Sequence, residues 1–245
     1  MILEIGVAEV VPDAAAVLAA LDVPADRAAR PHLEDLVASA LRAFEDTAAP
    51  VGIVADLSRE AFAEVYSGAP ANAPDSVVAD VYPRAEALSL FVVTLGSATS
   101  DAIARGFAAR DFALAATLDA VASEAADRAA EVVERRVERR LRDAGRLGDD
   151  AAALRYSPGY CGWDVGGQAA LFRHLKPGRI GVRLTDGGFM TPEKSVSGVI
   201  LAGPRQIHRF SPTYSFCASC ATHSCRERMA ALFGREARRS PDGSA

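Results

Sequence analysis

The 245-residue sequence lacks any apolar run long enough to cross a lipid bilayer. The longest such run, SLFVVTLG at residues 89–96, is far shorter than the roughly 20 residues that a membrane-spanning helix needs. The amino-terminal sequence MILEIGVAEV also has no basic segment of the kind that opens a secretory signal peptide. We therefore expect a cytoplasmic protein with no membrane partner.

The sequence also lacks an excess of basic residues. It has 27 Lys and Arg and 32 Asp and Glu, which gives a net charge of -5. Proteins that bind nucleic acid usually present a basic surface to its phosphates, so we expect no nucleic-acid partner. The sequence also lacks the GxGxxG, P-loop, HExxH and Ser-His-Asp signatures. No familiar catalytic motif therefore identifies an enzyme, and we leave open whether the protein is one.

Half of the residues are apolar, which is enough for one sizeable core. No internal repeat or domain linker is evident, and the Pro-, Ala- and Gly-rich residues 67–76 predict a surface loop. We predict a single α+β domain over residues 1–210, with a mainly antiparallel twisted sheet and long helices. A small cysteine-rich appendage follows at residues 211–234, and a disordered tail at residues 235–245.

The longest predicted element is a helix over residues 111–144, which contain neither Gly nor Pro. Its apolar positions recur at intervals of three and four, as on the buried face of a helix. These positions are Leu114, Leu118, Val121, Ala125, Ala129, Val132, Val133, Val137 and Leu141. The final VERRVERRLR alternates acidic and basic residues and predicts a solvated face with ion pairs.

Shorter elements precede and follow this helix. The β-branched residues 90–95 predict a buried strand that leads into a helical segment at residues 97–106. Asp164 is a suitable N-cap for a following helix. Residues 179–184 and 196–201 alternate like half-buried strands.

Two segments lack the regular period of a helix or strand and are rich in Pro, Gly and aromatic residues. They are RYSPGYCGW at residues 155–163 and LTDGGFMTPEKSVSGV at residues 184–199. Chains often build rigid loops around a ligand from such residues. The two segments are therefore candidate walls of a binding site.

Both segments resemble the activation domain of vitamin B12-dependent methionine synthase. The first matches that family's pattern at Arg155, Pro158, Gly159 and Tyr160. The second matches it at Met190, Pro192, Ser195, Val196, Ser197 and Gly198. The resemblance implies that the chain binds S-adenosylmethionine through residues of these segments.

In the first segment, the forked guanidinium of Arg155 suits the carboxylate of the ligand. Pro158 and Gly159 fix the loop and permit close approach of the backbone. Tyr160 offers an aromatic face to the purine or the cation, together with a hydroxyl group. The resemblance implies that all four are binding residues.

In the second segment, Ser195 and Ser197 suit a ribose or a carboxylate, Gly198 permits close approach, and Lys194 adds positive charge. The resemblance also implies a role for Asp127, which lies on the long helix where the family places a carboxylate near the ligand. The chain departs from its relatives after Gly198, where Val199-Ile200-Leu201 replace aromatic residues that contact the ligand.

A third cluster, FCASCATHSCRER at residues 216–228, brings Cys217, Cys220 and Cys225 close together in the sequence. Three thiolates can bind zinc, with His223 or His208 as the fourth ligand. Such thiols would otherwise be exposed to oxidation, so we predict a metal site.

The same cysteines can instead hold an iron-sulfur cluster, with Cys161 or an exogenous group as the fourth ligand. Reactive redox thiols and inert thiols remain further alternatives. Relatives of the activation domain that occur as separate proteins carry a similar cysteine-rich end. The chain therefore resembles this stand-alone branch.

The resemblance implies a role in methionine biosynthesis, in reductive reactivation of a corrinoid whose cobalt has been oxidised to an inert state. Methyl transfer from S-adenosylmethionine would draw the unfavourable reduction forward, and a flavodoxin or ferredoxin would supply the electron. The chain has no DxHxxG motif for binding cobalamin. We therefore expect the corrinoid on a partner, either methionine synthase or a related methyltransferase.

Two alternatives stay open. An iron-sulfur cluster on the cysteines would make the protein an electron-transfer partner of a corrinoid methyltransferase. A pocket that has lost its ligand would make it a scaffold.

Overall fold

The computed structural model describes residues 1–24, 30–209, 228 and 231–233. The chain falls into two compact units whose segments alternate along the sequence. The first unit comprises Met1–Ala55, Phe91–Val133 and Leu175–Ser197, and the second comprises Asp56–Leu90, Glu134–His174 and the described residues from Gly198 onward. Because the segments alternate, no single point in the chain separates the two units.

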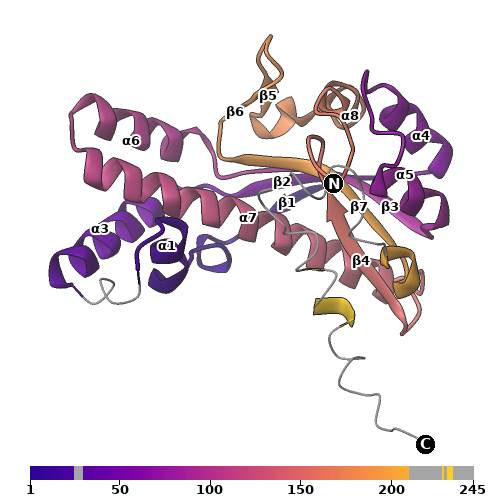
Figure 1. Ribbon diagram of the computed structural model, residues 1–245, viewed down its shortest axis with the longest axis horizontal. Helices are drawn as coiled ribbons and strands as arrows, with labels where there is room; N and C mark the ends of the chain where they lie inside the picture. The colour runs from indigo at the N-terminus through magenta and orange to yellow at the C-terminus, as the bar shows by residue number, and fades with distance from the viewer. Residues whose placement is uncertain (25–29, 210–227, 229–230, 234–245) are drawn as a thin grey trace, which may run out of the picture. The chain divides into compact units, whose positions relative to one another are not determined.

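Five strands form the main sheet in the order β1-β2-β3-β7-β4 (Figure 1). They are β1 (Ile2–Glu4), β2 (Val51–Leu57), β3 (Ala87–Thr94), β4 (Ala151–Tyr156) and β7 (Ser195–Pro204). β1 pairs antiparallel with β2, and β4 pairs antiparallel with β7. The predicted α+β class and antiparallel sheet are confirmed, as is the buried strand at β3, all of whose residues are buried.

In the first unit, α1 (Ala14–Ala20) packs against α3 (Pro31–Thr47), and α3 packs against α6 (Ser97–Ala108). Asp13 caps α1 by accepting a hydrogen bond from the backbone N–H of Ala16 at 2.8 Å. The Asp13 carboxylate also pairs with Arg128 at 3.1 Å. A small hairpin of β5 (Arg183–Leu184) and β6 (Met190–Thr191) completes this unit.

In the second unit, α4 (Arg59–Ser67), α5 (Val77–Val81) and α8 (Gly167–Leu175) lie close together (Figure 1). This unit contains an aromatic cluster. The rings of Phe62, Tyr66, Tyr82 and Trp163 lie edge to face or tilted, at centroid distances of 5.2–6.3 Å. Such arrangements stabilise a core beyond simple burial. The described chain also has four short 3-10 helices: η1 (Val7–Glu9), η2 (Tyr82–Arg84), η3 (Pro177–Ile180) and η4 (Arg205–His208).

The predicted long helix is confirmed as α7 (Phe112–Asp143), which contributes to both units. Its apolar residues are buried as the spacing predicted, including Val121, Ala125, Ala129 and Val137. In the described part of the chain, no helix is both long enough and apolar enough to cross a membrane.

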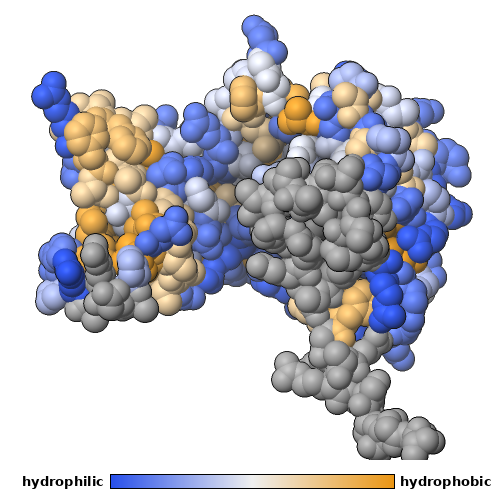
Figure 2. Space-filling model, viewed as in Figure 1, coloured by the Kyte–Doolittle hydropathy of each residue, from blue (hydrophilic) through white to orange (hydrophobic). Residues whose placement is uncertain are grey.

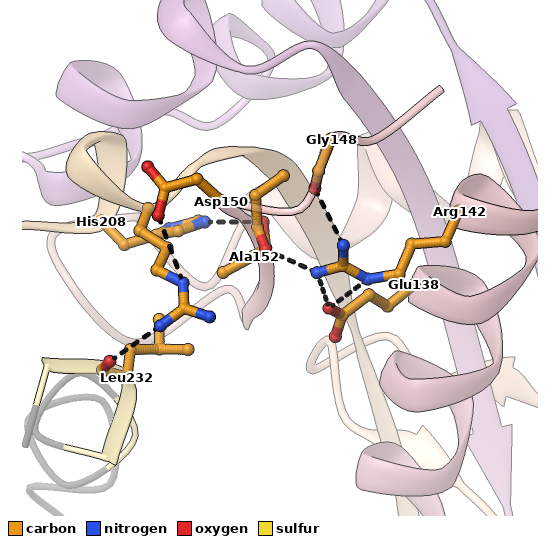
Figure 3. A network of polar contacts seen from close by, with 9 residues as sticks. Glu138, Arg142, Gly148, Asp150, Ala152, His208 and Leu232 are labelled. Carbon is orange, nitrogen blue, oxygen red and sulfur yellow. Dashed lines mark hydrogen bonds and ion pairs between the residues drawn. The ribbon is translucent and has the colours of Figure 1, made fainter. Parts of the chain in front are cut away.

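The carboxyl-terminal arginines of α7 are more than a solvated face, which corrects the sequence interpretation. Arg142 pairs with Glu138 one turn earlier and donates to the carbonyl oxygens of Gly148 at 2.8 Å and Ala151 at 2.6 Å (Figure 3). These bonds satisfy carbonyl groups in the connection between α7 and β4. The ion pairs were predicted, but their role in fixing the start of β4 was not.

The strand predicted at residues 179–184 is mostly wrong. Pro177 begins the 3-10 helix η3, which is bounded by Lys176 at φ 54° and Gly181 at φ 77°. The helix occupies residues 179 and 180, and left-handed Gly181 interrupts the chain after it, so only Arg183–Leu184 remains as a strand. The helix predicted after Asp164 is confirmed as α8.

An exposed apolar cluster lies where α6 turns into α7. Phe107 and Phe112 have ring centroids 6.4 Å apart, and Phe112 is 60% exposed. Figure 2 shows apolar atoms gathered over this end of the first unit. The pair forms a solvent-facing surface rather than part of the core.

Candidate ligand-binding site

Arg155 lies within β4, not in an irregular loop as the sequence suggested. It is opposite Ile200 in the β4–β7 register, and its residue surface is only 5% exposed. Its guanidinium Nη1 lies 3.6 Å from Oε2 of Glu134, on the carboxyl-terminal half of α7. The backbone N–H of Arg155 donates to the same oxygen at 2.6 Å. The arginine predicted to bind the ligand carboxylate is thus buried and paired with an acid.

Glu134 is a candidate functional residue that sequence reasoning missed. It is the second residue of the VERRVERRLR stretch, whose alternating charges suggested a solvated face. Its side chain is instead largely buried and lies between the guanidinium groups of Arg155 and Arg228, at 3.6 Å from each. Only the fold brings Glu134 and Arg155 together, because they are 21 positions apart in the sequence.

Arg228, from the FCASCATHSCRER segment, completes this group. Its Nη1 donates to the backbone carbonyl oxygen of Arg155 at 3.0 Å. The N–H and C=O of Arg155 are therefore both bound by side chains, one by Glu134 and the other by Arg228. Such partners suit β4, which is the last in the order of the described strands and has one strand neighbour among them.

The Pro158-Gly159-Tyr160 turn follows β4 directly. Gly159 has φ 90°, a left-handed conformation that favours glycine. Its N–H donates to the carbonyl oxygen of Trp163 at 2.7 Å, and the N–H of Trp163 donates to the carbonyl oxygen of Tyr160 at 3.0 Å. The turn is therefore closed on itself, while the Tyr160 side chain remains 49% exposed and open to a ligand.

Trp163 anchors this turn in the aromatic core of the second unit. It is 1% exposed, with ring centroids 5.7 Å from Phe62 and 6.1 Å from Tyr66. A Cβ at Gly167 would lie 2.2 Å from Nε1 of Trp163, so only glycine fits there. The base of the turn is thus held by packing that tolerates little change.

Residues 72–77 also hold the Pro-Gly-Tyr turn in place, through hydrogen bonds. Asn72 accepts a hydrogen bond from the N–H of Asp164 at 2.9 Å and donates to the carbonyl oxygen of Tyr66 at 2.7 Å. Ser76 donates to the carbonyl oxygen of Cys161 at 3.1 Å and is fully buried. The predicted surface loop at residues 67–76 is therefore partly buried, and it positions the turn.

The serines and glycine of the second motif lie in strand β7, which confirms the strand predicted at residues 196–201. These residues therefore do not form an irregular loop. Ser195 donates to the carbonyl oxygen of Pro192 at 2.7 Å, after the cis peptide bond between Thr191 and Pro192. Ser195 and Ser197 are buried within the first unit. Gly198 is also buried and precedes Val199, which is opposite Tyr156 on β4.

The aliphatic residues that follow this motif are core residues. Val199, Ile200 and Leu201 are at most 1% exposed, because they belong to the central part of β7. Their side chains are occupied in packing the sheet. The aromatic residues expected from the family are therefore replaced by core residues.

Two further residues of the predicted site lie in the first unit. Lys194 forms an ion pair with Asp119 at 2.7 Å and donates to Ser123 at 3.0 Å, so its charge is balanced by α7. Asp127 is exposed on the same helix. The structure shows these positions, and their contact with a ligand stays a prediction.

His208 is not suited to be a zinc ligand, which corrects one sequence alternative. It is buried, and its Nε2 lies 3.3 Å from the carbonyl oxygen of Ala152 (Figure 3). A carbonyl can only accept, so Nε2 carries the proton and Nδ1 accepts from the Tyr156 hydroxyl at 3.0 Å. Burial, with a smaller effect of the Arg84 charge, lowers the pKa of His208 to about 4. The ring is neutral and both nitrogens are engaged.

The other predicted metal ligands, Cys217, Cys220, Cys225 and His223, lie outside the described residues. Within the described ranges, no three His, Cys, Asp or Glu side chains are grouped as a metal site. Cys161, the alternative cluster ligand, lies in the Pro-Gly-Tyr turn at φ 55°.

The antiparallel sheet, the long helix and the Arg-Xaa-Xaa-Pro-Gly-Tyr sequence at the end of β4 define an α+β activation module of corrinoid-dependent methyl transfer. The chain belongs to the family described as vitamin B12 dependent methionine synthase, activation domain, whose model matches residues 64–211. Membership in this family implies a partner domain that carries the corrinoid.

A solved structure supports the fold. The chain is similar to a crystal structure of the MetH reactivation domain bound to AdoHcy, with a TM-score of 0.58 and 16% sequence identity. The similarity covers 95% of this chain and 89% of the other. No curated protein matches the chain.

Proposed function

We propose that the chain binds S-adenosylmethionine at Arg155 and supports reductive methylation of a corrinoid on a partner protein. The Arg155–Glu134 pair at the end of β4 is the observation that carries this proposal. The amino-acid end of the ligand has a carboxylate and an ammonium group close together. A guanidinium and a carboxylate 3.6 Å apart offer partners for both groups.

The turn after β4 supplies the second part of the proposed site. Tyr160 presents an exposed ring beside the strand end, where it can stack on the adenine or face the sulfonium. Trp163, Asn72 and Ser76 hold this turn, so it needs little ordering when the ligand binds. The AdoHcy found in the similar MetH structure supports this class of ligand.

In the proposed reaction, the corrinoid accepts one electron and the methyl group of S-adenosylmethionine, and S-adenosylhomocysteine leaves. The chain contributes by holding the ligand in a fixed orientation toward the partner. Arg155 and Glu134 would bind its amino-acid end, and Tyr160 its nucleoside or sulfonium. The resemblance assigns Ser195, Ser197, Gly198 and Asp127 to the same ligand.

The electron donor and the role of the cysteines belong to the same proposal. A flavodoxin or ferredoxin would supply the electron. Cys217, Cys220 and Cys225 would bind zinc or an iron-sulfur cluster, as their spacing suggests. Metal analysis and the visible spectrum of anaerobically purified protein distinguish these two states, since zinc sites are colourless.

Calorimetric titration with S-adenosylmethionine tests the central part of the proposal. We expect saturable binding by the wild type and roughly 10- to 100-fold weaker binding by Arg155→Ala, because one charged hydrogen bond is lost. Glu134→Gln should also weaken binding, since it removes the acceptor charge for the ammonium. Arg139→Ala, which changes an exposed arginine on α7, serves as the matched control.

Because Arg155→Ala removes one charged partner of the largely buried Glu134, the variants need a thermal unfolding curve beside each titration. A folded Arg155→Ala protein that binds as tightly as the wild type would place the ligand elsewhere. A wild type that does not bind S-adenosylmethionine would overturn the proposed function.

A further inference from the structure

We propose that Lys194 is a positioning residue of the second motif, which it holds against the side of α7 that carries Asp127. This inference rests on the proposed function, which assigns Asp127 and the serines of the motif to S-adenosylmethionine. It extends the site to an ion pair between Lys194 and Asp119. These residues, with Ser195 and Ser197, all belong to the first unit.

The side chain of Lys194 is bound by two residues one turn apart on α7. Its Nζ lies 2.7 Å from Oδ1 of Asp119 and donates to Oγ of Ser123 at 3.0 Å. The Ser123 hydroxyl uses its one hydrogen to bond the carbonyl oxygen of Asp119 at 2.9 Å, so its oxygen is left to accept from Lys194. The Lys194 side chain is 13% exposed, and it is therefore more restricted than the lysine of an open surface ion pair.

The backbone around Lys194 transmits this contact to Ser195. The carbonyl oxygen of Lys194 accepts a hydrogen bond at 3.0 Å from the N–H of Leu95, which follows β3 directly. The N–H of Ser195 donates to the carbonyl oxygen of Glu193 at 2.8 Å, and its hydroxyl donates to that of Pro192 at 2.7 Å. The four residues from Pro192 to Ser195 are therefore one closed turn, which is tied to Leu95 through its backbone and to α7 through Lys194.

Helical spacing relates this contact to Asp127. Asp119, Ser123 and Asp127 follow one another at intervals of four, so they lie on successive turns along one side of α7. Asp127 lies about 6 Å beyond Ser123 along the helix axis. Lys194 therefore attaches the start of the motif to the same side of the helix. A ligand that contacts both Asp127 and the serines requires these two parts in a fixed relation.

The test combines calorimetric titration of the full chain with S-adenosylmethionine and hydrogen exchange of residues 190–197. Lys194→Ala should weaken binding about tenfold and speed exchange in this segment, because the turn loses its side-chain contact with α7. Asp119→Ala removes the other half of the pair and should have the same two effects. The double variant should be little worse than either single variant, since all three remove one contact.

Two further variants separate positioning from general stability. Lys194→Arg keeps the positive charge and should retain most of the affinity. Asp13→Ala removes a different ion pair of α7, that with Arg128 at 3.1 Å, and the N-cap of α1. It should lower the unfolding temperature of the protein and leave the affinity for S-adenosylmethionine unchanged.

The outcomes distinguish this inference from the proposed function. A folded Lys194→Ala protein that binds S-adenosylmethionine as tightly as the wild type would overturn the inference alone, as would unchanged exchange at residues 190–197. An equal loss of affinity in Asp13→Ala would also overturn it, because binding would then follow the stability of the first unit. A wild type that does not bind S-adenosylmethionine would overturn the proposed function, and this role of Lys194 with it.

Discussion

Glu134 accepts a hydrogen bond from the backbone N–H of Arg155 at 2.6 Å, and its same oxygen lies 3.6 Å from the guanidinium of that residue. The carboxyl-terminal half of α7 is thereby tied to the end of β4 where the Pro-Gly-Tyr turn begins. The contact fixes both the backbone and the side chain of Arg155. A site that requires a defined orientation of its ligand benefits from such restraint.

The first prediction concerns the base of the turn. Gly167→Ala should lower the free energy of unfolding by about 1–3 kcal/mol, because its Cβ would overlap the buried Trp163 ring. Gly178→Ala is the control, since a Cβ there meets nothing within 4 Å. Trp163 is the one tryptophan of the sequence, so its fluorescence reports unfolding directly. Equal stability of the two variants would contradict the packing described for Trp163.

The second prediction concerns the hydrogen bonds by which Asn72 holds the Pro-Gly-Tyr turn. Asn72→Ala should leave the N–H of Asp164 and the carbonyl of Tyr66 without their side-chain partner, at a cost of about 1–3 kcal/mol. We expect faster amide hydrogen exchange in the turn and weaker binding of S-adenosylmethionine. Ser67→Ala removes an exposed hydroxyl that bonds within α4, and it should change neither measurement.

The third prediction concerns pH. His208 has a pKa of about 4 in the folded protein and near 6.5 when unfolded, so the unfolded chain binds the proton first as pH falls. Stability is therefore greatest above pH 6.5 and declines between about pH 6.5 and 4, by up to about 3 kcal/mol. Denaturant unfolding curves across this range measure the effect.

Removing the buried imidazole supplies the control for this pH dependence. His208→Leu should flatten the decline between about pH 6.5 and 4, although it also costs stability by removing the hydrogen bond between the imidazole and the Tyr156 hydroxyl. His174→Ala, at an exposed position on α8, should keep the slope of the wild type. An unaltered slope in His208→Leu would contradict a neutral, buried His208.

The fourth prediction concerns Asp56. Burial raises the pKa of this carboxyl, but hydrogen bonds from Ser89 and Arg140 and the Arg140 charge outweigh that effect and hold the pKa below its usual value. Asp56→Asn should therefore destabilise the protein at neutral pH, by about 1–3 kcal/mol. The difference from the wild type should shrink as pH falls through the lowered pKa, since the carboxylate is then protonated in both states. Thermal unfolding at neutral and acidic pH checks both statements.

Local sequence patterns predicted the elements whose formation depends on local spacing. The three- and four-residue period marked α7, and the β-branched run at residues 90–95 marked β3. The strand predicted at residues 179–184 failed because the 3-10 helix η3 extends to Ile180 and left-handed Gly181 follows it, which hydrophobic alternation does not reveal. The irregular first motif concealed that Arg155 belongs to a buried strand.

The residues that contact Arg155 and the Pro-Gly-Tyr turn could not be predicted from local sequence patterns. Arg155 and the turn were identified from the sequence, but Glu134, Asn72 and Ser76 were not. Asn72 and Asp164 are 92 positions apart, and Ser76 and Cys161 are 85 apart, so tertiary folding alone joins them. Charged residues on a helix usually face water, which is why Glu134 gave no distinct signal.

A crystal structure of the protein grown with S-adenosylhomocysteine tests the central claim most directly. We predict that the carboxylate of this ligand lies within hydrogen-bonding distance of the Arg155 guanidinium, with Tyr160 against its nucleoside. A ligand bound at another place, with Arg155 still paired to Glu134 and no ligand atom near it, would contradict the account.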